Sequence, residues 1–168
     1  FILFKMDRPT FYYNNKPVRA GGILFYVNDN GRKEYLLRKG KKHWGDVGGK
    51  TDKVDNNILD TIVREVVEET NFKLLDHSHT KKEALEALEK ILETTPNLDT
   101  YYSDISKYIL LVCELPIETR HLSMKRFGLV ETTCVMKHYF RWWSFIDRKK
   151  LHPRLRFHKE YFKIFTRT

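Results

Sequence analysis

Residues 48–72 decide the fold, and they read GGKTDKVDNNILDTIVREVVEETNF. Apolar residues recur in this stretch at i, i+3, i+4, i+7 and i+8, the spacing of one face of an amphipathic helix. They are Leu59, Ile62, Val63, Val66 and Val67. We therefore predict a helix over residues 57–70. Asp55, Asn56 or Asn57 can cap its start. Asn71 suits its end, because asparagine tolerates the left-handed conformation that ends many helices.

The predicted helix carries three carboxylates, Glu65, Glu68 and Glu69. At about 100° per residue they span an arc of roughly 100°, directed away from the apolar stripe. Like charges at this spacing destabilise a helix. A hard cation such as Mg²⁺ or Mn²⁺ would turn their repulsion into attraction, since such ions prefer oxygen ligands. Arg64 is placed to pair with a neighbouring glutamate.

A double glycine, Gly48-Gly49, precedes the acidic helix. Glycine lets the backbone come close to a ligand, and its carbonyl can supply a further metal oxygen. An ordinary solvated acidic face is the alternative interpretation of the three glutamates. The double glycine, followed by arginine and three glutamates on one helix, favours a metal site.

The flanking sequence predicts strands and a second helix. Asn28-Asp29-Asn30-Gly31 is a strong turn signal between two strand-like stretches, so residues 18–38 should form a hairpin. Glycines make residues 43–53 a predicted loop. The other predicted elements are a helix over 80–93, strands over 105–115 and 139–146, and a short helix over 160–165. This order predicts a mixed α/β sandwich.

The composition of the 168 residues suits one domain with a sizeable core. No apolar run approaches the roughly 20 residues that span a bilayer, so no membrane segment is expected. Cys113 and Cys134 lie in apolar stretches without metal-ligand spacing, which favours two reduced thiols. The expected compartment is the cytoplasm, with the nucleus as the alternative.

The net charge of +9 is unevenly distributed. Within residues 137–168, only Asp147 and Glu160 oppose ten lysines and arginines. A second basic cluster occupies residues 38–43, just before the double glycine. Such fields attract polyanions, although basic residues also serve general solubility.

At this point the sequence resembles the Nudix hydrolase family. That family's box runs Gly, five residues, Glu, seven residues, then Arg-Glu-aliphatic-x-Glu-Glu-x-Gly-aliphatic. Residues 64–72 follow its second half, with Asn71 in place of the glycine and the apolar Phe72 at the last position. From Gly49 to Arg64 the chain is one residue longer than the pattern, and no glutamate occupies the middle position. Asp55 is the nearest substitute and Asp52 the second.

The resemblance implies a Nudix-type α/β/α sandwich with a mixed β-sheet. Residues 1–168 would form a single Nudix-like hydrolase domain, with a helical insertion near 78–96 and a basic C-terminal segment over 137–168. The implied activity is hydrolysis of a phosphoanhydride bond with Mg²⁺ or Mn²⁺. The implied metal ligands and catalytic groups are Glu65, Glu68, Glu69 and the carbonyl of Gly48 or Gly49, with Arg64 orienting a glutamate. Glu131 is the candidate for a further ligand from a later loop, and Glu114 is the second choice.

Several basic and aromatic residues are candidates for substrate binding: Lys16, Arg19, Arg38, Lys39, Lys41, Lys42 and Trp44. Three substrate classes remain open, namely nucleotides and their derivatives, capped RNA, and diphosphoinositol polyphosphates. One alternative function is a catalytically inactive Nudix-like module that binds RNA or nucleotide. Another is a basic scaffold that binds nucleic acid without metal.

Overall fold

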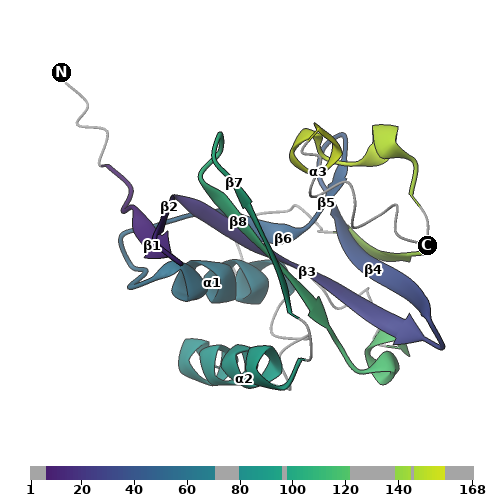
Figure 1. Cartoon of the computed structure of the whole chain (residues 1–168). Helices are drawn as coiled ribbons and strands as arrows, with labels where there is room; N and C mark the ends of the chain where they lie inside the picture. The colour runs from purple at the N-terminus through teal and green to yellow at the C-terminus, as the bar shows by residue number, and fades with distance from the viewer. Residues whose placement is uncertain (1–6, 71–79, 96–97, 122–138, 145, 158–168) are drawn as a thin grey trace.

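The computed structural model describes residues 7–70, 80–95, 98–121, 139–144 and 146–157 (Figure 1). The predicted helix over 160–165, Glu131, Cys134 and Asn71 lie outside the described residues. The elements, in chain order, are β1 (Phe11–Tyr13), β2 (Lys16–Val18), β3 (Ala20–Asp29), β4 (Arg32–Lys39), β5 (Trp44–Gly45), β6 (Val47–Lys50), α1 (Ile58–Thr70), α2 (Lys81–Thr94), β7 (Asp99–Ser103), β8 (Tyr108–Glu114), η1 (Ile117–His121), β9 (Tyr139–Trp143), η3 (Arg148–Lys150) and α3 (Pro153–Phe157).

Strand β3 lies at the centre of a mixed sheet. It pairs antiparallel with β4 and β6 and parallel with β8, and the main path of the sheet runs β5-β4-β3-β8-β7. Strand β9 pairs with β4 on its other side. The predicted mixed α/β fold is confirmed.

The predicted turn of the β3–β4 hairpin is also confirmed. Asn30 and Gly31 have φ angles of 52° and 92°, and two successive positive φ angles mark a type I′ turn. The Asn28 carboxamide oxygen accepts a hydrogen bond of 2.8 Å from the Gly31 amide. The strand begins at Ala20 rather than Val18, because Val18 pairs with Phe11 in a separate β1–β2 hairpin.

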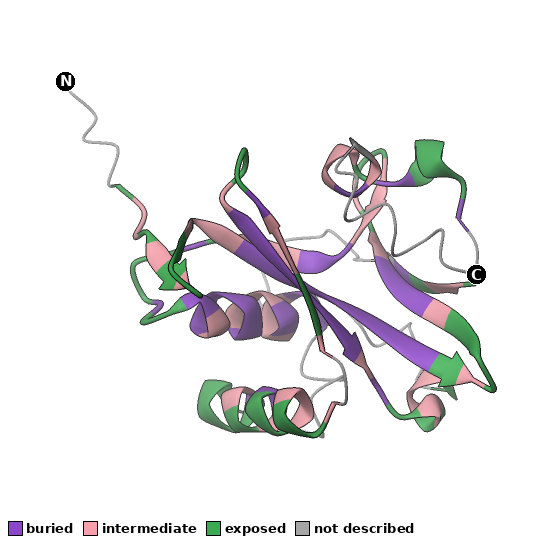
Figure 2. Ribbon diagram, in the orientation of Figure 1, coloured by how far each residue is buried: buried purple, intermediate pink, exposed green. Residues whose placement is uncertain are grey.

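Two clusters of buried side chains form the core, one on each face of the sheet. Figure 2 shows β3, β8 and α1 largely in the colour of buried residues. Helices α1 and α2 cover one face, and the predicted apolar stripe points inward, with Ile62, Val63 and Val66 at 0% exposure. On the other face, Leu151 and Leu155 from the C-terminal segment pack against the sheet. Helices therefore flank the sheet on both sides, although α3 has only five residues.

Some predicted boundaries were wrong. The predicted loop over 43–53 contains β5 and β6, and β7 was not predicted. The strand expected over 105–115 begins at Tyr108, since Ile105 lies 97% exposed in the turn before it. The strand expected over 139–146 ends at Trp143. Among the described residues, none of the helices has the length and hydropathy of a membrane span.

Candidate metal site

The acidic helix α1 lies directly against the double glycine of β6. A Cβ atom added at Gly49 would lie 2.5 Å from the Glu65 Cδ atom, well inside van der Waals contact. Only glycine therefore leaves room for this carboxylate. Within the sheet, β6 is held by backbone pairing with β3, in which Gly48 is opposite Gly22 and Gly49 is opposite Gly21.

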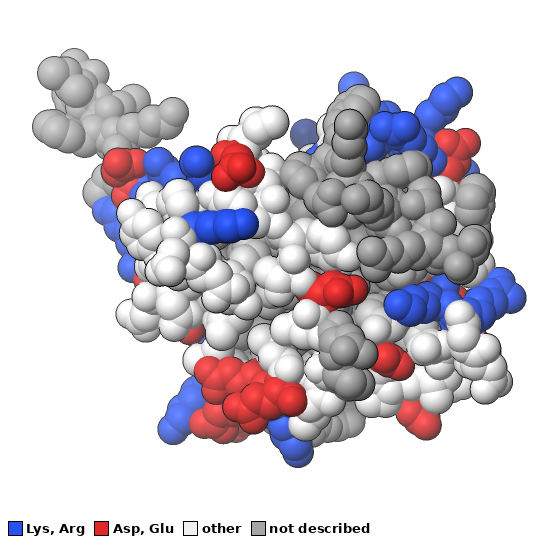
Figure 3. All heavy atoms as spheres, in the orientation of Figure 1, with Lys and Arg blue, Asp and Glu red and all other residues white. Residues whose placement is uncertain are grey.

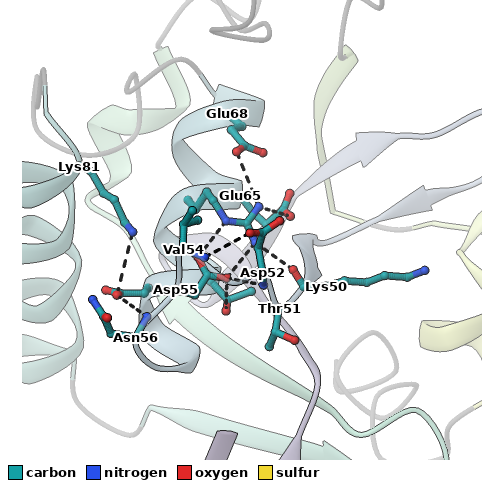
Figure 4. Close-up of polar contacts among 12 residues, drawn as sticks. Lys50, Thr51, Asp52, Val54, Asp55, Asn56, Glu65, Glu68 and Lys81 are labelled. Atoms are coloured by element: carbon teal, nitrogen blue, oxygen red, sulfur yellow. Dashed lines mark hydrogen bonds and ion pairs between the residues drawn. The ribbon is translucent and has the colours of Figure 1, made fainter. Parts of the chain in front are cut away.

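Arg64 connects the loop before α1 to the carboxylates on the helix. Figure 4 labels its partners Lys50, Asp55, Glu65 and Glu68. Its Nε and Nη2 atoms donate to the two oxygens of Asp55, at 2.9 and 3.0 Å, and Nη2 also donates to the Lys50 carbonyl at 2.9 Å. Its Nη1 atom donates to Glu65 at 3.1 Å and lies 3.6 Å from Glu68. The predicted pairing of Arg64 with a neighbouring glutamate is confirmed, and the main partner is Asp55.

Of the two aspartates that the sequence offers before the helix, Asp55 is the one that pairs with Arg64. Its side chain is fully buried and also accepts hydrogen bonds from the Thr61 hydroxyl and the Asp52 amide, both at 2.8 Å. Burial raises the pKa of Asp55, but these hydrogen bonds, led by those from Arg64, hold it below its ordinary value. Asp52 instead accepts from the Val54 amide at 3.2 Å. Asp55 follows Gly49 by six positions, so the extra residue lies between Asp55 and Arg64.

Glu69 is the most buried of the three glutamates, with 8% of its side chain exposed. Its Oε2 atom lies 3.1 Å from Arg38 Nε but makes no hydrogen bond within the part of the chain that the structure describes. Burial raises the pKa of Glu69 to about 8, and the charges of Glu65, Asp46 and Glu68 add to this rise against the opposing effect of Arg38. Burial also raises the pKa of Glu65.

The donors present fit a hard divalent cation. Three carboxylates from one and a half helical turns and the carbonyls of a glycine strand are oxygen ligands of the kind that Mg²⁺ and Mn²⁺ prefer. Among the described residues, the buried Glu69 Oε2 is ion-paired with Arg38 but accepts no hydrogen bond, so it is an oxygen that a cation could bind. As their side chains stand, no three acidic, histidine or cysteine groups in the described ranges converge to an ion-binding distance. Arg64 and Arg38 hold the carboxylates instead.

The predicted substrate-binding residues fall into separate groups. Arg38 lies at the site through its contact with Glu69. Lys39, Lys41 and Lys42 are exposed around the β4–β5 connection. Trp44 is partly buried and packs edge-on against Trp143, with ring centroids 5.1 Å apart.

Lys16 and Arg19 have partners away from the carboxylates. The Lys16 ammonium lies 4.9 Å from the centre of the Tyr102 ring, and Arg19 pairs with Asp7 at 3.1 Å. Glu114 accepts a hydrogen bond from Tyr26 at 3.4 Å. Figure 3 shows lysine and arginine side chains gathered over η3, in the basic C-terminal segment. Acidic side chains gather over α2 in the same view.

Three polar residues near the site were not predicted: Asp46, Tyr108 and Arg154. Asp46 lies between β5 and β6 with 1% exposure, and it accepts hydrogen bonds from the Tyr108 hydroxyl and the Arg154 guanidinium. An aspartate between two glycine-rich strand segments was the available signal. Its partners are far away in sequence and carry no local pattern.

Comparisons with known proteins find similarity in structure but not in sequence. The sequence matches no family profile and no curated relative. A binary complex of C. elegans Ap4A hydrolase is 17% identical, covers 88% of this chain and 93% of its own, and has a TM-score of 0.47. The NUDIX domain of Shewanella oneidensis NrtR, solved with ADP ribose, is 12% identical, covers 75% and 71%, and has a TM-score of 0.38.

A third solved structure is described as a candidate NUDIX hydrolase from Listeria monocytogenes. It is 12% identical, covers 80% of this chain and 83% of its own, and has a TM-score of 0.41. The solved structures that this mixed α/β fold resembles include Nudix proteins.

Proposed function

We propose that the protein is a metal-dependent pyrophosphohydrolase of the Nudix type, which cleaves a phosphoanhydride bond with the help of Mg²⁺ or Mn²⁺. One observation carries this proposal. Glu65 on α1 lies against the Gly49 backbone of β6, and Arg64 joins that carboxylate to the buried Asp55. The Nudix-like order of glycine, acid, arginine and glutamates in the sequence thus corresponds to one connected cluster in space.

The residues that would hold the metal are Glu65, Glu68, Glu69 and the carbonyl of Gly48 or Gly49. When bound, the ion supplies a lowered pKa for an attached water and neutralises charge on the phosphate oxygens. Arg64 keeps Glu65 in place through its hydrogen bond of 3.1 Å. Arg38, beside Glu69, is the predicted phosphate-binding cation in contact with this cluster in the described part of the chain.

The geometry supports a reaction that depends on charge and positioning. Phosphoryl transfer requires little covalent chemistry from the protein, so oriented cations and ligands provide most of the acceleration. The donors around α1 come from one rigid helix and one paired strand, which is where precise sites are built best. Nucleotides and their derivatives, capped RNA and diphosphoinositol polyphosphates remain the candidate substrates.

A hydrolysis panel tests the proposal. The substrates are nucleotides, a dinucleoside polyphosphate, capped RNA and an inositol pyrophosphate, each with Mg²⁺, with Mn²⁺ and with excess chelator. We expect turnover of at least one substrate with metal and none with chelator. Glu68→Gln should abolish turnover while the circular dichroism spectrum stays unchanged.

Glu86→Gln on the exposed face of α2 is the matched control, since it removes one helical carboxylate away from the site. It should retain full activity. Full activity of Glu68→Gln, or turnover in chelator, would refute the metal assignment. Binding without turnover across the panel would instead favour the inactive nucleotide- or RNA-binding module.

A further inference from the structure

A buried charged cluster lies behind the glycine strand, on the face of the sheet opposite α1. Asp46 accepts hydrogen bonds on one oxygen from the Tyr108 hydroxyl and on the other from Arg154 Nη2. Burial raises the pKa of Asp46, but the charge of Arg154 and these hydrogen bonds hold it below its ordinary value. The Arg154 guanidinium also lies 4.0 Å from the centre of the Tyr108 ring.

This cluster connects three separate parts of the chain. Asp46 precedes β6, Tyr108 begins β8, and Arg154 belongs to α3, 108 residues after Asp46. The Tyr108 hydroxyl fills the space left by two glycines. A Cβ atom at Gly48 would lie 2.5 Å from that hydroxyl, and one at Gly22 would collide with it.

Strand β6 is therefore in contact on both faces. Successive residues of a strand point to opposite faces of the sheet. Gly48 meets Tyr108 on one face, and Gly49 meets Glu65 of α1 on the other. The position of β6, and with it the carbonyls of both glycines, is set between the buried cluster and the acidic helix.

We infer that Arg154 is a positioning residue for the candidate metal site. It fixes β6 through Asp46 and Tyr108, so that the docked C-terminal segment completes the geometry between the glycine carbonyls and Glu65. The part of this inference that concerns the metal rests on the proposed function. The part that concerns β6 does not.

Arg154 is not needed merely to attach α3. Leu151 and Leu155 have 0% exposure and already pack that segment against the sheet. A buried ion pair commonly adds little net stability compared with apolar side chains of similar volume, because both charges lose their hydration. The pair instead restricts geometry. Together with the hydrogen bond from Tyr108, the hydrogen bond from Arg154 to Asp46 allows few positions of the β5–β6 junction.

Hydrogen exchange in the metal-free protein tests the positioning directly. Arg154→Met should speed amide exchange of residues 48–50 by about tenfold or more, while exchange in α1 changes little. Arg154→Lys should recover part of the protection. Lys149→Met is the matched control, because it removes an exposed positive charge from the neighbouring η3, and it should leave β6 protected. Unchanged exchange of β6 in folded Arg154→Met would overturn the inference.

A double variant keeps the test valid if Arg154→Met unfolds. Arg154→Met leaves Asp46 as an uncompensated buried charge, whereas Asp46→Asn combined with Arg154→Met removes both charges. The free energy of unfolding should then recover, while amide exchange in β6 stays faster than in the wild type. If β6 protection recovers together with stability, Arg154 only neutralises Asp46, and the positioning role is wrong.

Mn²⁺ titration by calorimetry then tests the connection to the metal. The double variant should bind Mn²⁺ about tenfold or more weakly than the wild type, the size of effect seen when groups that orient metal ligands are lost. Loss of β6 protection with unchanged Mn²⁺ affinity would show that β6 position does not serve the metal site. If the wild type binds no Mn²⁺, the proposed function fails, and the exchange experiment alone decides the role of Arg154.

Discussion

Arg64 and Asp55 form a two-pronged ion pair, with Nε–Oδ1 and Nη2–Oδ2 distances of 2.9 and 3.0 Å. The aspartate has no exposed side-chain surface, and only 18% of the arginine side chain is exposed. The planar guanidinium matches both carboxylate oxygens, which fixes its orientation. Its remaining donors reach Glu65 and the Lys50 carbonyl, so one pair joins the loop, the strand and the helix.

Asp55→Asn should weaken the site while the fold survives. The amide cannot accept both hydrogen bonds from Arg64, and a weakened charged hydrogen bond costs about 2 kcal/mol of unfolding free energy. Loss of a group that orients a ligand should lower metal affinity by about tenfold to a hundredfold. Urea unfolding and Mn²⁺ titration measure the two effects.

Asp52→Asn is the matched control for that variant. Asp52 is exposed and its carboxylate accepts from the Val54 amide. The Asp52→Asn variant should therefore bind metal with nearly the affinity of the wild type. Equal effects of the two variants on metal affinity would contradict the assignment of Asp55 as the anchor of Arg64.

Gly49→Ala should reduce activity much more than stability. The three atoms nearest to the added Cβ all belong to the end of the Glu65 side chain, which can rotate away at small cost in folding. A carboxylate displaced by about 1 Å can lower the rate about a hundredfold. Gly45→Ala in the same region is the control, because its Cβ would make an ordinary contact of 3.5 Å with His152. Hydrolysis rates and thermal melts of the Gly49→Ala and Gly45→Ala variants measure activity and stability separately. Comparable hydrolysis rates in the two variants would show that Glu65 is not needed at that position.

The sequence predicted α1 and the β3–β4 turn because both follow local rules. A stripe of apolar residues at helical spacing and an Asn-Gly pair at the turn need no distant partner. The sequence ranked Asp55 ahead of Asp52 by position alone. The choice between them is decided by the direction of the Arg64 side chain, which depends on how the loop folds back onto the helix.

Strands β5 and β6 could not be predicted because they depend on distant partners and not on local rules. Trp44 to Lys50 contains three glycines, which weaken a strand in isolation. These residues become strands because β4 and β3 offer backbone partners. The buried Asp46 cluster depends on the same tertiary packing, since Arg154 reaches it from the far end of the chain.

Gly22→Ala should destabilise the protein strongly. The added Cβ would collide with the Tyr108 hydroxyl and the Asp46 carboxylate and lie 2.7 Å from the Val47 carbonyl, none of which has room to move. Overpacking of this kind costs about 1–3 kcal/mol or more. At Gly21 the corresponding contacts with Ile58 are 3.1 Å or longer, so Gly21→Ala should cost less. The midpoints of urea unfolding should show a larger loss of stability in Gly22→Ala than in Gly21→Ala. The reverse order would show that the Asp46 cluster is loosely packed.

The stability of the metal-free protein should fall as the pH rises from 6 to 9. Burial raises the pKa of Glu69 to about 8, above its ordinary value, so the folded state binds a proton that the unfolded state has already released. The stabilisation is therefore complete below the ordinary glutamate pKa and is lost as the pH rises through about 8. At roughly 1.4 kcal/mol per unit, the loss over this range is at most about 3 kcal/mol.

Saturating Mn²⁺ should reduce this loss, because the ion competes with the proton for the carboxylate. Glu69→Gln should remove most of the slope, since the amide does not titrate. Denaturant unfolding at several pH values, with and without Mn²⁺, measures both effects. A slope that is the same in Glu69→Gln and in the wild type would assign the pH dependence to another group and remove the electrostatic reason for a cation beside Glu69.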